Sequence, residues 1–397
     1  MKILFVNSLY FPIQVGGAEK SVQFLAESLA SMGHEVGVIS LIDSRATPSS
    51  QIINGVKTYT ITLSNLFWPF SERTAPSILK LLWHLIDVLN PFNLRAIDRI
   101  IEEFKPDVVH TNNLKGISVA AWLAAKKRGL PVVHTLRDYY LICPRSSLFK
   151  NNRRCQTQCG ECKFFAAPKK ALSKHVDAVT GISEFILAKH IDQGFFEGAV
   201  DKIKIFNAFP ANEHPMEKAI SERVKFGYIG RVGPEKGIES ILSLAMDTPE
   251  ATFLVAGDMA SDYGKQLVET YARPNIQFVG YQAPHTFFNQ IDILIVPSIW
   301  DEPFGRIIVE AYSYGVPVMG AMRGGIPELI EEGRTGFLFE PDLAGDMAST
   351  LTKIMQAPDC LAEMAPRCYE KSGEFAAGPI LDQYLTLYEK HINRAHR

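Results

Sequence analysis

The chain alternates between short runs of apolar, often β-branched residues and longer segments in which apolar residues recur every three or four positions. The short runs have the length of buried strands, and the longer segments have the period of amphipathic helices. This alternation predicts α/β architecture with doubly wound parallel sheets. The strands predicted in the first half cover residues 2–6, 35–41, 107–111, 131–136, 178–182 and 202–206.

The start of the chain shows one such unit clearly. A glycine-rich turn follows the first strand, and Gly33 stands just after the next periodic segment as a helix stop signal. A helix over 17–31 between two strands forms a βαβ crossover. Its apolar stripe consists of Val22, Leu25, Ala26, Leu29 and Ala30.

The pattern then restarts after a connector. Residues 207–215 contain two prolines and no periodicity, which predicts a link between two domains, one over 1–208 and one over 209–374. Tandem doubly wound domains would bind ligands between the carboxyl ends of their sheets. Strands of the second domain are predicted over 224–229, 252–256, 276–279, 293–296 and 316–319. A final helix within about 375–397 is predicted to pack back on the first domain through Ile380, Leu381, Tyr384, Leu387 and Tyr388.

Composition places the chain among ordinary globular proteins. Of 397 residues, 47% are hydrophobic and 21% are charged, with 41 basic and 43 acidic side chains and a formal charge of −2. These values exclude disordered, collagenous and small disulfide-rich proteins. No run approaches the roughly 18 to 20 apolar residues that cross a bilayer. The apolar run at the N-terminus stops at Asn7, too early for a signal peptide, so we expect a cytoplasmic protein.

The small net charge hides an asymmetry. Residues 1–200 carry 23 basic and 16 acidic side chains, which leaves 18 basic and 27 acidic side chains for the rest. The excess of +7 in the first half favours an anionic partner there, such as a phosphorylated lipid or an anionic membrane surface. Chance scatter of surface charge is an equally good explanation.

Two glutamates separated by seven residues form the most specific motif. Glu302 stands at the entrance of a predicted helix and Glu310 lies inside it. Their Cα atoms would be roughly 12 Å apart, which is too far for the acid and nucleophile of a retaining glycosidase. Two acceptors at this spacing suit the two ends of a sugar nucleotide, with helix amides between them for phosphate. Taken alone, the motif is also explained by a helix-dipole carboxylate and a solvated helix residue.

A glycine turn with two cations follows the first strand of the second domain. Gly230, Arg231, Gly233, Lys236 and Gly237 lead from the strand at 224–229 into a helix. Arg231 and Lys236 would stand beside a helix N-terminus, where they could neutralise a diphosphate. A plain turn is the alternative. Further glycine turns, each of which is also explained as a tight turn, lie at Gly16-Gly17 and at Gly324-Gly325.

In this order, the motifs resemble the retaining glycosyltransferases of family 4, which have the GT-B fold. The motifs are Gly16-Gly17-Ala18-Glu19, Gly230-Arg231 to Lys236-Gly237, Glu302 to Glu310-Ala311, Gly315-Val316-Pro317 and Gly324-Gly325 to Glu328-Leu329. The resemblance covers nearly the whole chain and implies an acceptor domain followed by a nucleotide-sugar domain.

The resemblance also implies roles for single residues. Arg231 and Lys236 would bind the donor diphosphate, Glu302 the sugar hydroxyls and Glu310 the ribose hydroxyls. Gly16 and Gly17 would approach the phosphate and the sugar. The donor site is completed by Phe304, Gly305 and Arg306 within the motif. Catalysis is assigned to Glu302, Arg231, Lys236 and Arg137.

One position departs from the family pattern. Members commonly have Thr-x-His after a strand of the first domain, and this chain has Thr135-Leu136-Arg137. Arg137 cannot act as a base, although it could stabilise the leaving phosphate or hold an anionic acceptor. Asp138 and His134 are the candidate acceptor-binding residues. For His134, a satisfied histidine on a buried strand is at least as good an interpretation.

The sequence has no D-x-D triplet of the kind that holds a divalent ion on a diphosphate. We therefore predict catalysis without a metal cofactor, with Arg231 and Lys236 in place of the metal. Cys143, Cys155, Cys159 and Cys162 form a cluster that predicts either a structural zinc site or reduced bystanders.

Basic and aromatic residues surround these cysteines. They suit anionic headgroups or a polyprenyl diphosphate acceptor, and no nucleic-acid recognition motif is present. The apolar stretch 78–89 predicts a buried helix in preference to one that enters a membrane interface. The basic residues are Lys150, Arg153, Arg154, Lys163, Lys169, Lys170 and Lys174, and the aromatic ones are Phe164 and Phe165.

These observations predict an enzyme that moves a sugar from a nucleotide diphosphate sugar to a hydroxyl of a glycan or polyprenyl-linked acceptor. We expect it in polysaccharide or glycolipid synthesis, at the inner face of a membrane. A sugar-nucleotide 2-epimerase and a catalytically silent sugar-nucleotide binding subunit are the alternatives. A nicotinamide dehydrogenase is disfavoured because the first turn lacks G-x-G-x-x-G.

Overall fold

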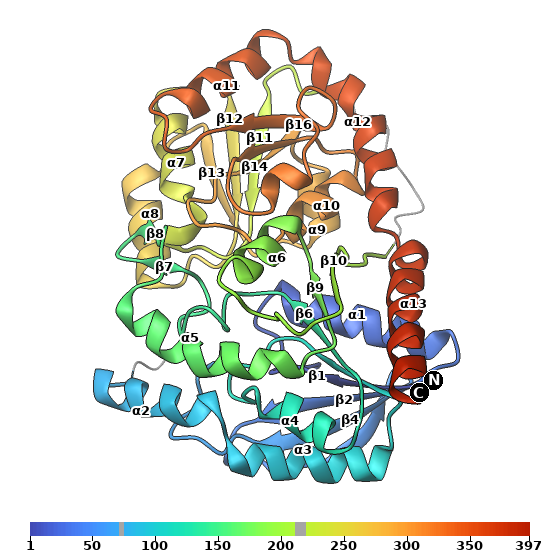
Figure 1. Ribbon diagram of the computed structural model, residues 1–397. Helices are drawn as coiled ribbons and strands as arrows, with labels where there is room; N and C mark the ends of the chain where they lie inside the picture. Colours follow the sequence, from blue (N-terminus) through green and yellow to red (C-terminus); the bar gives the residue numbers. More distant parts are fainter. Residues whose placement is uncertain (71–74, 211–219) are drawn as a thin grey trace. The chain divides into compact units, whose positions relative to one another are not determined.

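The computed structural model describes residues 1–70, 75–210 and 220–397 (Figure 1). These residues form two compact units, and the chain passes between them more than once. The first unit contains Met1–Leu148, Gln156–Phe209 and Ala377–Arg397, and the second contains Phe149–Cys155 and Pro210–Ala376. The predicted connector at 207–215 lies partly outside the described residues, because 211–219 are not described.

The first unit is built on an eight-stranded sheet in the order β10-β9-β6-β5-β1-β2-β4-β3, in which only β3 runs antiparallel to its neighbour. Its strands are β1 (Lys2–Val6), β2 (Glu35–Ile42), β3 (Ser50–Ile53), β4 (Val56–Thr62), β5 (Val108–Thr111), β6 (Val132–Leu136), β9 (Ala178–Gly181) and β10 (Asp201–Lys204). Its helices are α1 (Gly17–Ser31), α2 (Ser77–Val88), α3 (Pro91–Phe104), α4 (Ala120–Lys127), α5 (Gly160–Leu172), α6 (Glu184–Ile191) and α13 (Ala377–Ala395).

Helices cover both faces of this sheet because successive strand residues point to opposite sides. Ile3 and Phe5 of β1 face the core formed with α1 and α13, whereas Leu4 lies near Phe104 of α3 on the other face. The C-terminal helix α13 is tied to the sheet by the Tyr388 hydroxyl, which lies 2.6 Å from Nδ1 of the buried His110. The apolar stripe predicted for this helix is buried in the same core.

The second unit has an all-parallel six-stranded sheet in the order β13-β12-β11-β14-β15-β16. Its strands are β11 (Lys225–Ile229), β12 (Thr252–Ala256), β13 (Ile276–Gly280), β14 (Ile293–Val296), β15 (Val318–Ala321) and β16 (Gly336–Phe339). Its helices are α7 (Ile238–Met246), α8 (Asp262–Tyr271), α9 (Pro284–Phe288), α10 (Arg306–Tyr312), α11 (Asp346–Gln356) and α12 (Asp359–Ser372). The predicted α/β fold with two parallel sheets is confirmed.

A small hairpin of β7 (Phe149–Lys150) and β8 (Arg153–Arg154) also belongs to the second unit, although the chain on both sides of it lies in the first. Asn151 and Asn152 form its two-residue turn, each with φ of 55°. Positive φ at both positions matches a type I′ turn, which asparagine tolerates. The first domain predicted from the sequence, over 1–208, includes this segment.

The prediction of a buried helix over 78–89 is wrong. Helix α2 buries Trp83 and Asp87, but Ile78, Leu82 and Leu85 are 62%, 43% and 45% exposed. No helix in the described part of the chain is long and apolar enough to cross a bilayer.

Candidate functional site

In the second unit, the loops that follow β11, β14 and β15 meet at the carboxyl edge of the sheet. Gly237 has φ of 70°, and a Cβ atom there would lie 2.0 Å from the carbonyl oxygen of Pro297. Gly324 has φ of 59°, and a Cβ atom there would lie 2.0 Å from the carbonyl oxygen of Glu302. Glycine is therefore required at both positions by backbone conformation and by close approach. The motif glycines bring together loops that are distant in sequence.

Lys236 and Glu302 form the central ion pair of these loops. The Lys236 ammonium binds Oε1 of Glu302, and the Ser298 hydroxyl donates to the same oxygen at 3.0 Å. The ammonium also lies 5.0 Å from the ring centroid of Trp300. Burial raises the pKa of Glu302, but the Lys236 charge and the hydrogen bonds outweigh this effect and hold the pKa below its ordinary value. Glu302 is therefore a carboxylate at neutral pH.

The other two charged motif residues have partners close by in sequence. The Arg231 guanidinium donates to Glu235 at 2.6 Å, and its side chain is 66% exposed. In α10, Nε of Arg306 donates to Glu310 at 2.7 Å, and Gly305 with φ of 107° begins the helix. The structure brings Lys236 and Glu302 into contact, whereas Arg231 and Glu310 are each occupied by a neighbour.

The side chain of Phe304, a residue of the predicted donor set, is buried in the second unit. Its side chain is 3% exposed, and its ring centroid lies 6.0 Å from that of Phe375 in an edge-on arrangement. The ring therefore belongs to the core of the second unit and does not present a face to a ligand.

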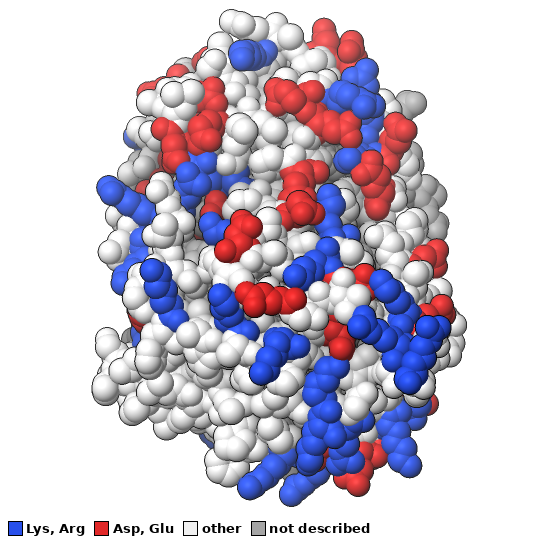
Figure 2. Space-filling view, in the orientation of Figure 1, with Lys and Arg blue, Asp and Glu red and all other residues white. Residues whose placement is uncertain are grey.

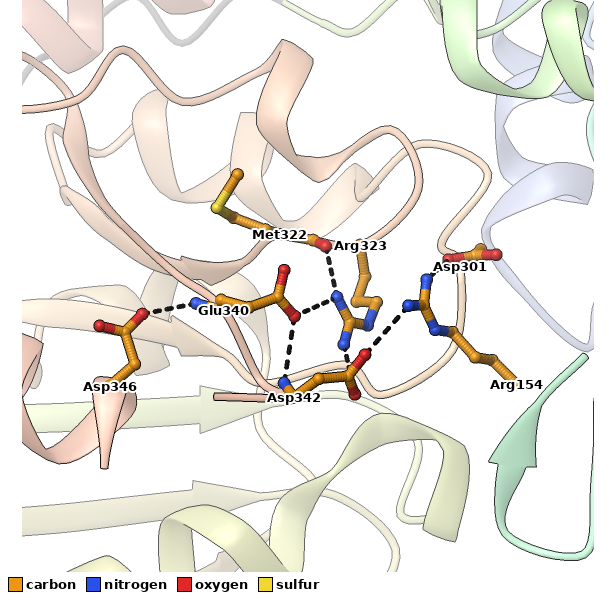
Figure 3. A network of polar contacts seen from close by, with 7 residues as sticks. All are labelled: Arg154, Asp301, Met322, Arg323, Glu340, Asp342 and Asp346. Atoms are coloured by element: carbon orange, nitrogen blue, oxygen red, sulfur yellow. Dashed lines mark hydrogen bonds and ion pairs between the residues drawn. The ribbon is translucent and has the colours of Figure 1, made fainter. Parts of the chain in front are cut away.

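A polar network that sequence reasoning missed includes Asp301, the residue before Glu302 (Figure 3). Arg154 of β8 lies 3.0 Å from Asp342 and 3.6 Å from Asp301. Buried Arg323 contacts Asp342 at 2.6 Å and donates to Glu340 at 2.6 Å. The only sequence signal for this network was that Arg323 and Asp301 flank motif residues.

In the first unit, the Gly16-Gly17 turn begins α1. The backbone N–H of Gly16 donates to Oε2 of Glu19 at 2.8 Å, and Glu19 is buried. A glutamate at this position caps the first turn of a helix and satisfies one of its free N–H groups. Glu19 therefore has a structural role in the motif.

Arg137 follows β6 and is buried among amides at the carboxyl edge of the first sheet. Its Nε donates to Oδ1 of Asn112 at 2.8 Å, and its Nη1 donates to Oδ1 of Asn207. Asn112 follows β5 and Asn207 lies beyond β10, so both stand where ligands of parallel sheets bind. Neither asparagine was among the predicted site residues, and their positions just beyond strands were the available signal.

His134 and Asp138 differ in their surroundings. His134 is 3% exposed, its Nδ1 lies 2.8 Å from the Thr111 hydroxyl, and burial lowers its pKa to about 3. It is a neutral histidine on a buried strand, which is the second of the two interpretations that the sequence left open. Asp138 is half-buried, accepts the Tyr140 N–H at 2.8 Å, and has a pKa raised by burial to about 6.

The predicted zinc site is not formed. Among the described residues, no three His, Cys, Asp or Glu side chains are grouped so that they could hold a metal ion. Cys155 belongs to the second unit, whereas Cys143, Cys159 and Cys162 belong to the first.

Comparison with known proteins identifies the family. A model described as "Glycosyltransferase Family 4" matches residues 15–203, and one described as "Glycosyl transferases group 1" matches residues 211–373. An uncharacterized 42.6 kDa protein in the cps region of Klebsiella pneumoniae is 39% identical over 329 residues, which are 83% of this chain and 87% of that protein. The chain belongs to the glycosyltransferases of the GT4/GT-B type.

Solved structures agree on the fold of this glycosyltransferase. Sucrose-phosphate synthase from Thermosynechococcus elongatus matches with a TM-score of 0.73 at 19% identity, covering 98% of each chain. Anabaena Alr3699/HepE in complex with UDP and glucose matches with a TM-score of 0.72 at 21% identity, covering 98% of this chain and 99% of that one. The chain therefore has the GT-B fold.

Proposed function

We propose that this glycosyltransferase moves a sugar, with retention of anomeric configuration and without a metal, to a hydroxyl of a glycan or polyprenyl-linked acceptor. The observation that carries the proposal is the contact between Lys236 and Glu302 where the loops after β11, β14 and β15 meet. One cation and one carboxylate, held side by side, suit the diphosphate and the adjoining sugar of a single donor.

Each charged group has a chemical role in this proposal. Lys236 and Arg231 neutralise the diphosphate, whose negative charge grows as the sugar leaves. Glu302 is ionised and can accept hydrogen bonds from sugar hydroxyls, while Glu310 accepts them from the ribose. The hydroxyl of the acceptor attacks the face from which the diphosphate departs, and a diphosphate oxygen takes its proton.

The acceptor and the pathway are proposed from a relative. The Klebsiella protein is named for the cps region, which supports a role in cell-surface polysaccharide or glycolipid synthesis. The guanidinium of Arg137 is a candidate for holding an anionic group in the first unit, and the half-buried Asp138 is a candidate for binding an acceptor hydroxyl. A peripheral position at the inner face of a membrane is part of the same proposal.

Thermal unfolding with UDP, GDP and ADP sugars tests donor binding, because a ligand of the folded state raises the melting temperature. We expect one nucleotide to dominate. Glu310→Gln should weaken the shift with the free nucleotide diphosphate and with the sugar nucleotide equally, whereas Glu302→Gln should weaken only the increment that the sugar adds. Glu269→Gln, an exposed position on α8, is the control.

Product analysis tests the reaction itself. NMR of the glycoside formed from an α-linked donor should show an α-linkage. Inversion would contradict retention. An epimer formed without acceptor would support the epimerase, and donor binding without transfer or hydrolysis would support the silent subunit.

A further inference from the structure

The first unit presents an apolar surface centred on α2. Nine large apolar side chains there are between 39% and 63% exposed. They lie on α2, at the start of α3, on the loop before α2 and on α5, which packs against α2 through Phe165 and His84 at 5.5 Å between ring centroids. We call this the α2 surface, and it consists of Leu66, Ile78, Leu79, Leu81, Leu82, Leu85, Leu89, Phe92 and Phe164.

The orientation of α2 is held from its inner side. Trp83 is buried, and its Nε1 donates to the carbonyl of Phe67 at 2.9 Å. Asp87 is buried, and its Oδ1 accepts the N–H of Gly116 at 2.7 Å. With these two residues anchored, the leucines of the helix point outward. An apolar patch of this extent marks an interaction site.

The charges beside the α2 surface are mostly positive. Exposed lysines lie on α2 at Lys80 and on or just after α5 at Lys163, Lys170 and Lys174, with Glu161 as an exposed acid of α5. In Figure 2 the area over α2 is largely free of charged atoms, and basic side chains lie beside it over α5. A two-fold dimer through this surface would bring the lysines of both copies toward each other, which disfavours a second copy as the occupant.

We propose that the α2 surface is the part of the chain that docks on a bilayer containing anionic lipid, an inference that rests on the membrane position in the proposed function. The 12 residues of α2 span roughly 18 Å, less than a bilayer core, so the helix lies in the plane of the interface. Its leucines enter the boundary between headgroups and acyl chains, and the lysines contact the phosphates of the headgroups.

Flotation of the full chain with lipid vesicles tests this proposal. We expect binding to phosphatidylglycerol–phosphatidylcholine vesicles that weakens in high salt. Leu81→Ser with Leu85→Ser should lower the partition coefficient on the order of tenfold. Lys163→Glu should lower it about fivefold on anionic vesicles and leave binding to pure phosphatidylcholine unchanged. Exposed positions of the second unit, Leu343→Ser and Lys353→Glu, are the matched controls.

Melting temperatures and light scattering complete the test. The serine variants should melt no lower than wild type, because the changed side chains are exposed. Absence of vesicle binding by the folded wild type would overturn this proposal together with the proposed membrane position. Serine variants that bind vesicles as tightly as wild type would overturn only the role of the α2 surface. A wild-type dimer that the serine variants dissolve would also overturn it and would assign the surface to a second copy.

A different observation concerns Arg154 in the β7–β8 hairpin. Its guanidinium lies between Asp342 at 3.0 Å and Asp301 at 3.6 Å, and Asp301 directly precedes Glu302 (Figure 3). The backbone carbonyl of Glu302 itself accepts a hydrogen bond from the N–H of Gly325 at 2.7 Å. The loop that carries Glu302 is therefore held by the hairpin and by the loop after β15.

The rest of the network makes Asp342 a firm anchor. Arg323, which is 2% exposed, contacts Asp342 at 2.6 Å, and the N–H of Asp342 donates to Glu340 at 3.1 Å. The N–H of Glu340 in turn donates to Asp346 at the start of α11, at 2.7 Å. Arg154 thus joins this anchor to the residue that precedes Glu302.

We infer that Arg154 is a positioning residue, which holds the Glu302 carboxylate for the donor sugar through Asp301 and Asp342. This inference rests on the proposed function. Arg154→Met should reduce the extra affinity of UDP-glucose over UDP about fivefold and leave the affinity for UDP unchanged. Arg154→Lys should retain part of the extra affinity for UDP-glucose, because lysine keeps the positive charge. Arg153→Met, at an exposed position of the same hairpin, should behave as wild type.

Calorimetric titration with UDP and UDP-glucose separates the possible failures. If wild type binds UDP-glucose no better than UDP, the proposed role of Glu302 toward this sugar fails. If wild type shows the difference and Arg154→Met keeps it, only the role of Arg154 fails. Equal loss of both affinities with a lower melting temperature would make Arg154 merely structural and overturn the inference.

Discussion

The contribution of the Lys236–Glu302 ion pair to stability can be measured with single and double variants. Both side chains are largely buried, at 21% and 12% exposure, so Lys236→Met leaves a carboxylate without its counter-charge. We expect a loss of about 2 kcal/mol in the free energy of unfolding at neutral pH. Adding Glu302→Gln to Lys236→Met should recover most of this loss, because the unpaired charge is gone. Urea unfolding of the two single variants and the double variant measures the coupling, and purely additive effects would contradict it.

The pH dependence of this pair has a defined sign. The folded pKa of Glu302 lies below its ordinary value of 4.5, so the pair stabilises the protein above that pH. This contribution is lost as the pH falls through the folded pKa. The difference in stability between wild type and Glu302→Gln should therefore shrink in acid.

For Asp138, stability depends on pH in the opposite direction. Burial raises its pKa from 3.8 to about 6, so its ionisation destabilises the folded state increasingly as the pH rises through that window. Asp138→Asn keeps an oxygen for the Tyr140 N–H and removes the charge. Because the site is partly open to solvent, we expect a gain of about 1 kcal/mol at pH 7 that vanishes in acid.

The kinetics of sugar transfer test whether Asp138 also binds the acceptor. If the carboxylate binds the acceptor, Asp138→Asn should raise the KM for the acceptor while it stabilises the protein. A gain in stability that does not change with pH would contradict the buried charge. Unchanged kinetics for the acceptor would contradict the binding role.

At the scale of elements, glycine turns position the site, and Gly324 is the sharpest test. Gly324→Ala places a Cβ atom 2.0 Å from the carbonyl oxygen of Glu302, in a backbone region that alanine disfavours at φ of 59°. We expect a loss of about 3 kcal/mol in the free energy of unfolding, together with weaker donor binding. Gly333→Ala is the matched control, because φ is 71° and no atom lies within 4 Å of the added Cβ. It should cost only about 1 kcal/mol.

Hydrophobic pattern predicted most elements but failed where packing is decided by distant partners. The helix over 17–31 and the strands over 2–6, 252–256 and 293–296 have the bounds found in the structure. Strands β4 and β16 were missed because each follows a turn rather than a helix. The burial of α2 was misjudged because apolar composition does not show whether another surface covers a helix.

At the scale of the whole molecule, sequence motifs located the loops of the site but not what holds them. Local signals such as glycine turns and strand ends are readable, because they depend on neighbouring residues. Arg154 lies beside Asp301 and Asp342 because residues 149–155 leave the first unit and join the second, which no local pattern encodes. The same is true of the amides of Asn112 and Asn207 around Arg137.

The proposed reaction needs no metal ion, which can be tested on the complete enzyme. Two protein cations, Arg231 and Lys236, follow β11 at the edge where the donor loops meet, and the sequence has no D-x-D triplet to place a divalent ion on the diphosphate. Transfer from the preferred nucleotide sugar should therefore proceed at an unchanged rate in EDTA. Lys236→Met should lower kcat on the order of a hundredfold, as expected for losing a charge that stabilises a leaving group. Added Mg²⁺ should leave wild type unaffected, whereas a wild-type enzyme that is active only with Mg²⁺ or Mn²⁺ would show that a metal, not this lysine, carries the leaving diphosphate.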